Sequence, residues 1–195
     1  APRQGGAQPP ANRPHPTQSP RIATPTPPGG QASPTDSVPG PAGRARALLN
    51  SSRYEAARGP FLEALRQQPQ NVGLRLEFAA AARQAGDHQL ATDHLHTVVA
   101  LAPKRADGRY ALASLLALNL RYEECLPHAS EAARSEPGNG LYRSLHAQAL
   151  LALGRTAEAL KEAEAALLQA PTESEPRLIL ANSLLAVGNY REAED

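Results

Sequence analysis

The sequence predicts an all-α protein, an α-solenoid of about four and a half stacked helix–turn–helix units preceded by a disordered Pro-rich tail. Three observations predict this fold. Twelve of the 19 prolines lie in residues 1–43. Aromatic residues are only 4 % of the chain and Trp and Met are absent, so a core must consist mainly of Ala, Leu and Val. Such a core suits closely packed helices better than a β-sandwich. Beyond the tail, small residues and prolines recur with one fixed period.

The tail is expected over residues 1–43. Its large aliphatic residues are Ile22 and Val38, so it cannot bury enough apolar surface to offset the entropy of ordering. Its prolines favour an extended polyproline II conformation. Pro25-Thr26-Pro27-Pro28 fits a PxxP recognition motif, but such tracts match short motifs freely, and a semi-rigid spacer is the favoured interpretation.

The period beyond the tail is 34 residues, the distance that separates Pro69, Pro103, Pro137 and Pro171. Three further rows of small residues share this register. They are Ala45, Ala79, Ala113, Ala147 and Ala181; Ala57, Ala91, Cys125, Ala159 and Ala193; and Ala64, Val98, Ala132 and Ala166. A side chain no larger than Ala lets two helices approach closely where they cross, so the rows predict helix–helix contacts.

Each unit contains two apolar stripes at helical spacing. In one unit these predict a first helix near Leu141–Leu153 and a second near Thr156–Gln169. Gly154 ends the first helix, and Gly86 and Gly188 occupy the same register in other units, where Ser52 and Leu120 replace them. Pro60 and Pro127 fall inside expected second helices on outward faces, where each should kink its helix or cost about 3 kcal/mol.

A 34-residue helix–turn–helix with Ala-x3-Phe and a closing Pro resembles the tetratricopeptide repeat (TPR) family. Ala57, Phe61 and Pro69 match that spacing, and the resemblance covers residues 44–195. The units then span 38–71, 72–105, 106–139, 140–173 and an incomplete 174–195. The last unit lacks a polar cap, so we expect the chain to continue beyond Asp195 and this end to fray or to pair with a second copy.

The resemblance implies a right-handed superhelix whose concave groove, lined by the first helices, binds a peptide or protein segment. By elimination, the first-helix positions not used in packing are expected to contact this partner. They are Glu77, Arg83, Gln84, Tyr110, Ser114, Leu118, Ser144, Gln148, Leu178 and Asn182. The Lys and Asn clamp that some family members use for a C-terminal carboxylate is absent, because Leu76, Ala80, Ala111, Leu141 and Leu145 occupy the equivalent sites.

Four arginines also follow the period: Arg75, Arg109, Arg143 and Arg177. They could grip an acidic partner, but the favoured interpretation is structural, with each stem lying along the helix pair and each head in water. His94 and His128 are expected on outer faces of second helices. No histidine pair has metal-ligand spacing, and Cys125 fills a packing position, so no metal or cofactor is expected and Cys125 should be an inert buried thiol.

The charge is nearly balanced, with 20 basic and 19 acidic residues, which gives no support for nucleic-acid binding. No apolar run approaches the ~20 residues of a membrane span, and the common catalytic motifs are absent. We therefore expect a non-catalytic scaffold for protein interactions. Two alternatives stay open: the recognition arm of a larger enzyme, such as a transferase continuing beyond residue 195, and a bacterial cell-envelope assembly factor. The compartment stays open between bacterial cytoplasm and periplasm.

Overall fold

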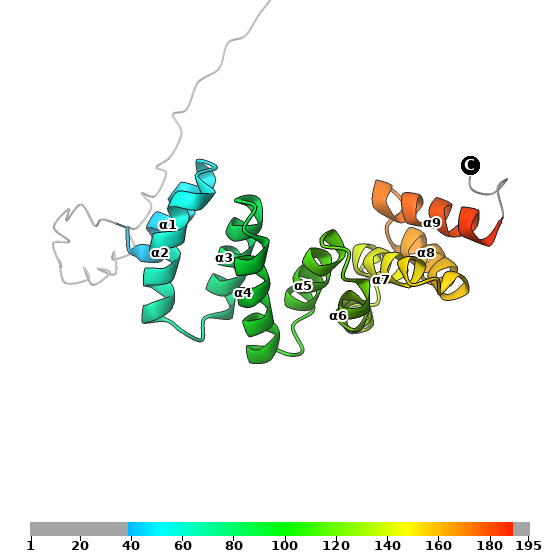
Figure 1. Cartoon of the computed structure of the whole chain (residues 1–195), viewed down its shortest axis with the longest axis horizontal. Coiled ribbons are helices and arrows are strands. Elements are labelled where there is room, and N and C mark those ends of the chain that lie inside the picture. The colour runs from blue at the N-terminus through cyan, green and yellow to red at the C-terminus, as the bar shows by residue number, and fades with distance from the viewer. Residues whose placement is uncertain (1–38, 189–195) are drawn as a thin grey trace, which may run out of the picture. The chain divides into compact units, whose positions relative to one another are not determined.

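The computed structural model describes residues 39–188. The chain divides into two units, Ala1–Ser37 and Val38–Asp195, and the described residues all belong to the second. Most of the expected tail, residues 1–38, and the end of the fifth repeat, residues 189–195, thus lie outside the described part. Within 39–188 the backbone forms helices joined by short connections, which follow one another in a row (Figure 1).

The described residues form nine helices that alternate between the first and the second helix of each repeat. Their bounds are α1 Pro41–Asn50, α2 Tyr54–Gln67, α3 Val72–Gln84, α4 His88–Leu101, α5 Ala106–Leu118, α6 Tyr122–Ser135, α7 Gly140–Ala152, α8 Thr156–Gln169 and α9 Ser174–Val187. The two helices expected in the fourth repeat are confirmed as α7 and α8. Because α1 begins at Pro41, residues 41–43 are helical, and the boundary expected at residue 43 is wrong by one helical turn.

The turn inside each repeat uses a left-handed residue at the same register. Gly86, Gly154 and Gly188 have φ values of 82°, 73° and 85°, and Ser52 and Leu120 adopt 55° and 59° without being glycine. In the first four repeats the following residue donates its N–H back to the last turn of the first helix, as in Arg121 N to Leu116 O at 2.9 Å. This is the Schellman arrangement, which satisfies carbonyls that the helix end leaves free.

The small-residue rows pack where helices cross. Ala57, Ala91, Cys125 and Ala159 are all 0 % exposed. The approach between α7 and α8 is closer still, because a Cβ built on Gly140 would lie 2.6 Å from the Cβ of Ala170 and 2.7 Å from the carbonyl oxygen of Ala166. The rows therefore act as predicted: they let helix backbones approach to a distance that larger side chains would prevent.

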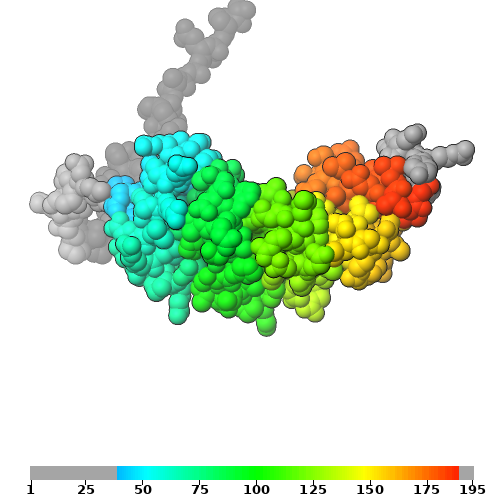
Figure 2. Space-filling model, in the orientation of Figure 1, coloured from blue at the N-terminus to red at the C-terminus, as the bar shows by residue number. Residues whose placement is uncertain are grey.

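Neighbouring repeats bury one another's apolar faces. Each second helix packs on the first helix of the next repeat, and α7 also contacts α9. Between the first two repeats, Phe61 stacks on Phe78 with ring centroids 5.1 Å apart. Figure 2 shows that the repeats are in contact along the described part. No helix between residues 39 and 188 combines the length and apolar character needed to cross a bilayer.

Both prolines expected inside second helices are indeed there. Helix α2 continues through Pro60, and α6 continues through Pro127, which is exposed. The outward position of Pro127 places its ring where it does not disturb packing against the neighbouring repeats, whereas Pro60 is half-buried. The missing backbone donor then remains as a local cost to each helix.

A cavity of about 220 Å³ lies between the first and second repeats. Its lining comprises Tyr54, Glu55 and Arg58 of α2 together with Phe78, Ala82, Ala85, Asp87 and Leu90 of the second repeat. A comparison of the residues at one position of the 34-residue repeat explains the cavity. Where the second repeat has Ala82, the next two repeats have Leu116 and Leu150, which are 0 % and 2 % exposed. The second repeat thus lacks the side chain that fills this space in its neighbours.

We expect Ala82→Leu to raise the free energy of unfolding by about 1–2 kcal/mol, because three buried carbon atoms would replace empty space. Chemical denaturation of the whole chain measures the change. Ala56→Leu, at an exposed site on α2, is the matched control and should leave the stability unchanged. A loss of stability in Ala82→Leu would show that the cavity cannot accept the leucine found at this register elsewhere.

Candidate functional site: a groove along the first helices

A groove of about 610 Å³ runs along the first helices of successive repeats. Helices α3, α5 and α7 build most of it, and α4, α9 and the turn after α5 each add one residue. Its lining comprises Leu76, Ala79, Ala80, Arg83, Leu95, Tyr110, Ala111, Ser114, Ala117, Leu118, Leu120, Leu145, Gln148 and Glu175. The groove therefore extends over several repeats instead of belonging to one.

Small residues give the groove its depth and leucines give it an apolar surface. Leu95 and Leu145 are buried beneath it, each 3 % exposed, and Ala80 and Ala111 add little bulk above them. At its edge, Leu118 and Leu120 are 58 % and 74 % exposed. Apolar surface that is contiguous and exposed is typical of a binding site rather than of ordinary protein surface.

Tyr110 is the central aromatic residue of the groove. Its ring stacks on that of Tyr142 in the next repeat, with centroids 4.6 Å apart and an interplanar angle of 28°. Burial raises the pKa of Tyr110, and the Glu175 carboxylate raises it further, whereas Ser114 and Arg83 act in the opposite direction. The hydroxyl therefore stays protonated near neutral pH, and the ring is held between two repeats.

Glu175 reaches the groove from the second residue of α9. Burial raises the pKa of its carboxyl group, and the neighbouring Glu173 adds to this increase. Arg83 lies in the last turn of α3, which α5 and α7 separate from α9 in the row of first helices. The groove thus has an acidic side chain from α9 and a basic side chain from α3, and both charges act on the Tyr110 hydroxyl.

The structure brings together half of the side chains expected to contact a partner. Arg83, Tyr110, Ser114, Leu118 and Gln148 all line the groove. They come from three successive first helices, as the common register requires. Their role in binding stays a prediction.

The other expected contact residues lie elsewhere. Glu77 forms an ion pair with Arg46 at 2.8 Å, and Gln84 lines a separate surface depression beside Ser52. Leu178 and Asn182 are exposed on α9 outside the groove. Ser144 is 0 % exposed, so its prediction as a contact residue is wrong. Its position in the period is inner-facing, but α7 is covered there by the neighbouring helices.

Sequence reasoning missed Ala79, Leu95, Leu120 and Glu175 as lining residues. Ala79 belongs to a small-residue row and was assigned to packing alone, although it both packs in the core and lines the groove. Leu120 could have been found, because it is a leucine at a turn position where the other repeats have Gly or Ser. Glu175 carries no such signal, since only the curvature of the stack brings the start of α9 to the groove.

The periodic arginines have a structural role that differs from the one expected. Arg75 Nη2, Arg109 Nε and Arg143 Nε donate to the carbonyl oxygens of the closing prolines Pro69, Pro103 and Pro137 at 2.6, 2.6 and 3.0 Å. Arg177 instead reaches Thr172 O at 3.1 Å. The heads are therefore engaged with the backbone and do not lie free in water, so that part of the interpretation is wrong.

Each of the first three arginines also contacts the second helix 19 residues further along. Arg75 and Arg109 approach Nδ1 of His94 and His128 at 3.4 Å, and Arg143 Nη1 donates to Glu162 Oε2 at 2.9 Å. A guanidinium only donates hydrogen bonds, so in the first two contacts Nδ1 must accept and the imidazole must be neutral. Burial foremost, and then the nearby arginine, lower the pKa of both histidines.

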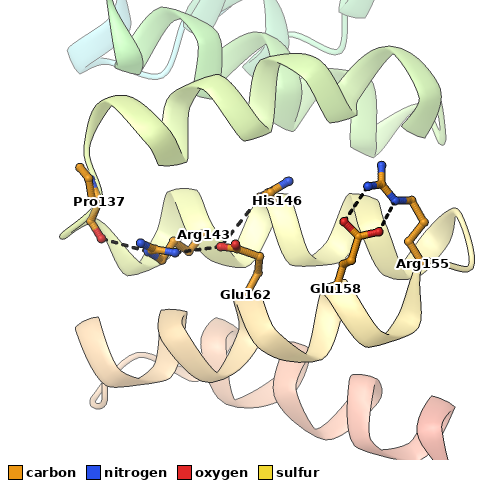
Figure 3. Close-up of polar contacts among 6 residues, drawn as sticks. All are labelled: Pro137, Arg143, His146, Arg155, Glu158 and Glu162. Atoms are coloured by element: carbon orange, nitrogen blue, oxygen red, sulfur yellow. Dashed lines mark hydrogen bonds and ion pairs between the residues drawn. The ribbon is translucent and has the colours of Figure 1, made fainter.

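Figure 3 shows the third of these contacts, where Arg143 joins the Pro137 carbonyl to Glu162 and His146 lies on the other side of that carboxylate. His146 Nδ1 is 3.7 Å from Glu162 Oε2. Burial lowers the pKa of His146, although Glu162 opposes this change. We call the three sets, each an arginine with its proline carbonyl and its second-helix partner, the arginine staples.

Cys125 is fully buried, and burial raises its pKa to about 11. The thiol is therefore protonated near neutral pH, as expected for a packing residue rather than a nucleophile. Among residues 39–188, no three His, Cys, Asp or Glu side chains converge in a way that could hold a metal ion.

No protein-family model and no curated protein sequence matches the chain. Several solved structures are similar to the chain. MamA from Desulfovibrio magneticus RS-1 superposes with a TM-score of 0.73 at 17 % identity, covering 77 % of this chain and 85 % of that one. MamA from AMB-1 gives 0.69 at 23 % identity over 78 % and 90 %. YrrB, described as a TPR protein with an unusual peptide-binding site, gives 0.66 at 17 % identity over 76 % and 77 %.

The chain has a tetratricopeptide repeat fold. The nine described helices, their single register and the structural likeness to YrrB all agree on this point. The TPR register also explains the position of the groove, because the first helices of successive repeats line one side of the stack and carry twelve of the fourteen lining residues.

Removal of an arginine staple should lower stability without affecting the groove. We expect Arg143→Ala to reduce the free energy of unfolding by about 1–3 kcal/mol, because it leaves the Pro137 carbonyl and the Glu162 carboxylate without their donor. Denaturant unfolding measures the loss. Arg134→Ala, which removes an exposed arginine paired only with Glu131 in its own helix, is the control and should change stability little.

The histidine contacts should make stability depend on pH. Because the folded state lowers the pKa of His94 and His128 below 6.5, the unfolded chain binds more protons at mildly acidic pH. The stability that the two neutral histidines contribute is fully present above about pH 6.5, and it is lost as the pH falls through their folded-state pKa values. Melting curves between pH 7.5 and 5.5 should show this fall, and the double variant His94→Gln/His128→Gln should flatten it. An equally steep fall in that variant would contradict the assignment.

Proposed function

We propose that the chain is a protein-interaction scaffold whose groove holds an extended or helical segment of another protein. The observation that carries this proposal is the groove itself, a volume of about 610 Å³ lined by apolar and small residues from successive repeats. A surface of this kind can accept a segment several residues long, because its length follows the stack. Its leucines would bury more apolar area in the complex than in the free protein.

The packing of the groove supports a preformed site. Tyr110 is held by its stack on Tyr142, and Leu145 lies in the core beneath the surface. A rigid groove loses little conformational entropy on binding, which favours affinity for a short segment. YrrB, which shares the fold, is described as having a peptide-binding site, and this likeness in fold adds support. The same groove would serve equally in a recognition arm of a larger enzyme.

A side chain that fills the groove should weaken peptide binding. Peptides would first be selected on the whole chain from a random display library, and their affinities then measured by fluorescence titration. We expect Ser114→Arg, in the middle of the groove on α5, to weaken binding at least about tenfold by steric exclusion. Ser135→Arg, at the exposed end of α6, is the matched control and should bind like the parent chain.

Melting curves would establish that both variants are folded. Equal affinity of the selected peptides for Ser114→Arg and the parent chain would overturn the proposal, because the peptides would then bind elsewhere.

A further inference from the structure

Glu175 is the one carboxylate among the residues that line the groove, and it forms no ion pair with any residue that the structure describes. Ion pairs within 4.0 Å are formed by eight acidic side chains of the described residues, and Glu175 is not among them. Its side chain is nevertheless only partly exposed and lines the groove. A carboxylate that has lost part of its hydration without gaining a cation is a site where an incoming cation is favoured.

The ring of Tyr110 adds a second feature that suits a cation. It lines the same groove as Glu175, and the two are close enough for the carboxylate to raise the pKa of the tyrosine hydroxyl. Tyr142 stacks on the ring and so fixes its orientation. An aromatic face beside a carboxylate binds a Lys or Arg side chain by two attractions, since the ring quadrupole and the negative charge act on the same cation.

The other end of the groove has the opposite charge. Arg83, from α3, forms no ion pair with any residue that the structure describes, and its charge also reaches the Tyr110 hydroxyl. Helices α5 and α7 lie between α3 and α9 in the row (Figure 1). The groove therefore carries opposite charges on α3 and α9, both of which act on the Tyr110 hydroxyl between them, and Ala111 and Leu145 add apolar surface to the same lining.

We propose, on the basis of the function proposed above, that the bound segment carries a Lys or Arg side chain that binds between the Glu175 carboxylate and the Tyr110 ring. An aliphatic residue of the same segment covers the apolar surface, and an acidic residue meets Arg83. The occupant is thus a peptide segment with a basic residue and an acidic residue on either side of an aliphatic one. Charge complementarity of this kind sets the direction in which a segment lies in its groove.

The test uses the peptides selected on the whole chain. Glu175→Gln should weaken their binding about tenfold, because the cation loses a charge-assisted hydrogen bond. Glu173→Gln removes the same charge two residues earlier, outside the groove, and should leave the affinity unchanged. Replacement of the peptide's basic residue by norleucine should weaken binding to the parent chain by a similar factor, but should have no further effect on Glu175→Gln.

Arg83→Gln provides the corresponding test at the other end, with Arg66→Gln on α2 as its control. Arg83→Gln should weaken only those peptides that retain their acidic residue. Melting curves of all four variants would confirm that they fold.

The outcomes separate this inference from the proposed function. If Ser114→Arg weakens binding at least about tenfold but Glu175→Gln binds like the parent chain, the groove is the binding site and the cation subsite is overturned. Selected peptides without a basic residue would overturn it equally. If Ser114→Arg has no effect, the proposed function fails first, whatever the charged variants do.

Discussion

The close approach of helices at small residues is the constraint on which the rest of this structure depends. Ala57, Ala91, Cys125 and Ala159 are completely buried at one register, and Gly140 allows an approach that even Ala would prevent. With few aromatic residues available, the core obtains its contacts from short distances between backbones instead of from large side chains. A small residue also leaves space unfilled at Ala82, where a cavity replaces the leucine side chain of the following repeats.

The arginine staples add polar contacts to this apolar stack. Arg75, Arg109 and Arg143 each join the end of one repeat to the second helix of the next through a proline carbonyl. The proline stops the preceding helix, and its carbonyl then becomes an acceptor with a fixed position. The arginine and the closing proline of each of these repeats therefore act as a pair. Because two of the staples end on neutral histidines, they couple the stack to protonation.

The groove arises from the same packing. First helices lie next to one another at a spacing that small residues set, and the surface between Arg83 and Glu175 consists mainly of Ala and Leu. Its charged side chains are those that the stack leaves without partners, whereas neighbouring charges such as Glu77 and Arg46 are paired. A scaffold built in this way keeps its stability in the helix crossings and its binding capacity in the first-helix positions that the crossings do not use.

The sequence alone determined the repeat, the two helices of the fourth repeat and the turns, because these depend on local spacing: a 34-residue register, a left-handed position such as Gly154 and a closing proline such as Pro171. Of the ten residues that it assigned to the groove, five line it. Only the tertiary structure showed that Ser144 is covered, that Glu175 reaches the groove from α9, and that Arg75 and His94 meet. These facts depend on how successive repeats rotate against one another, and a period along the chain contains no information about that rotation.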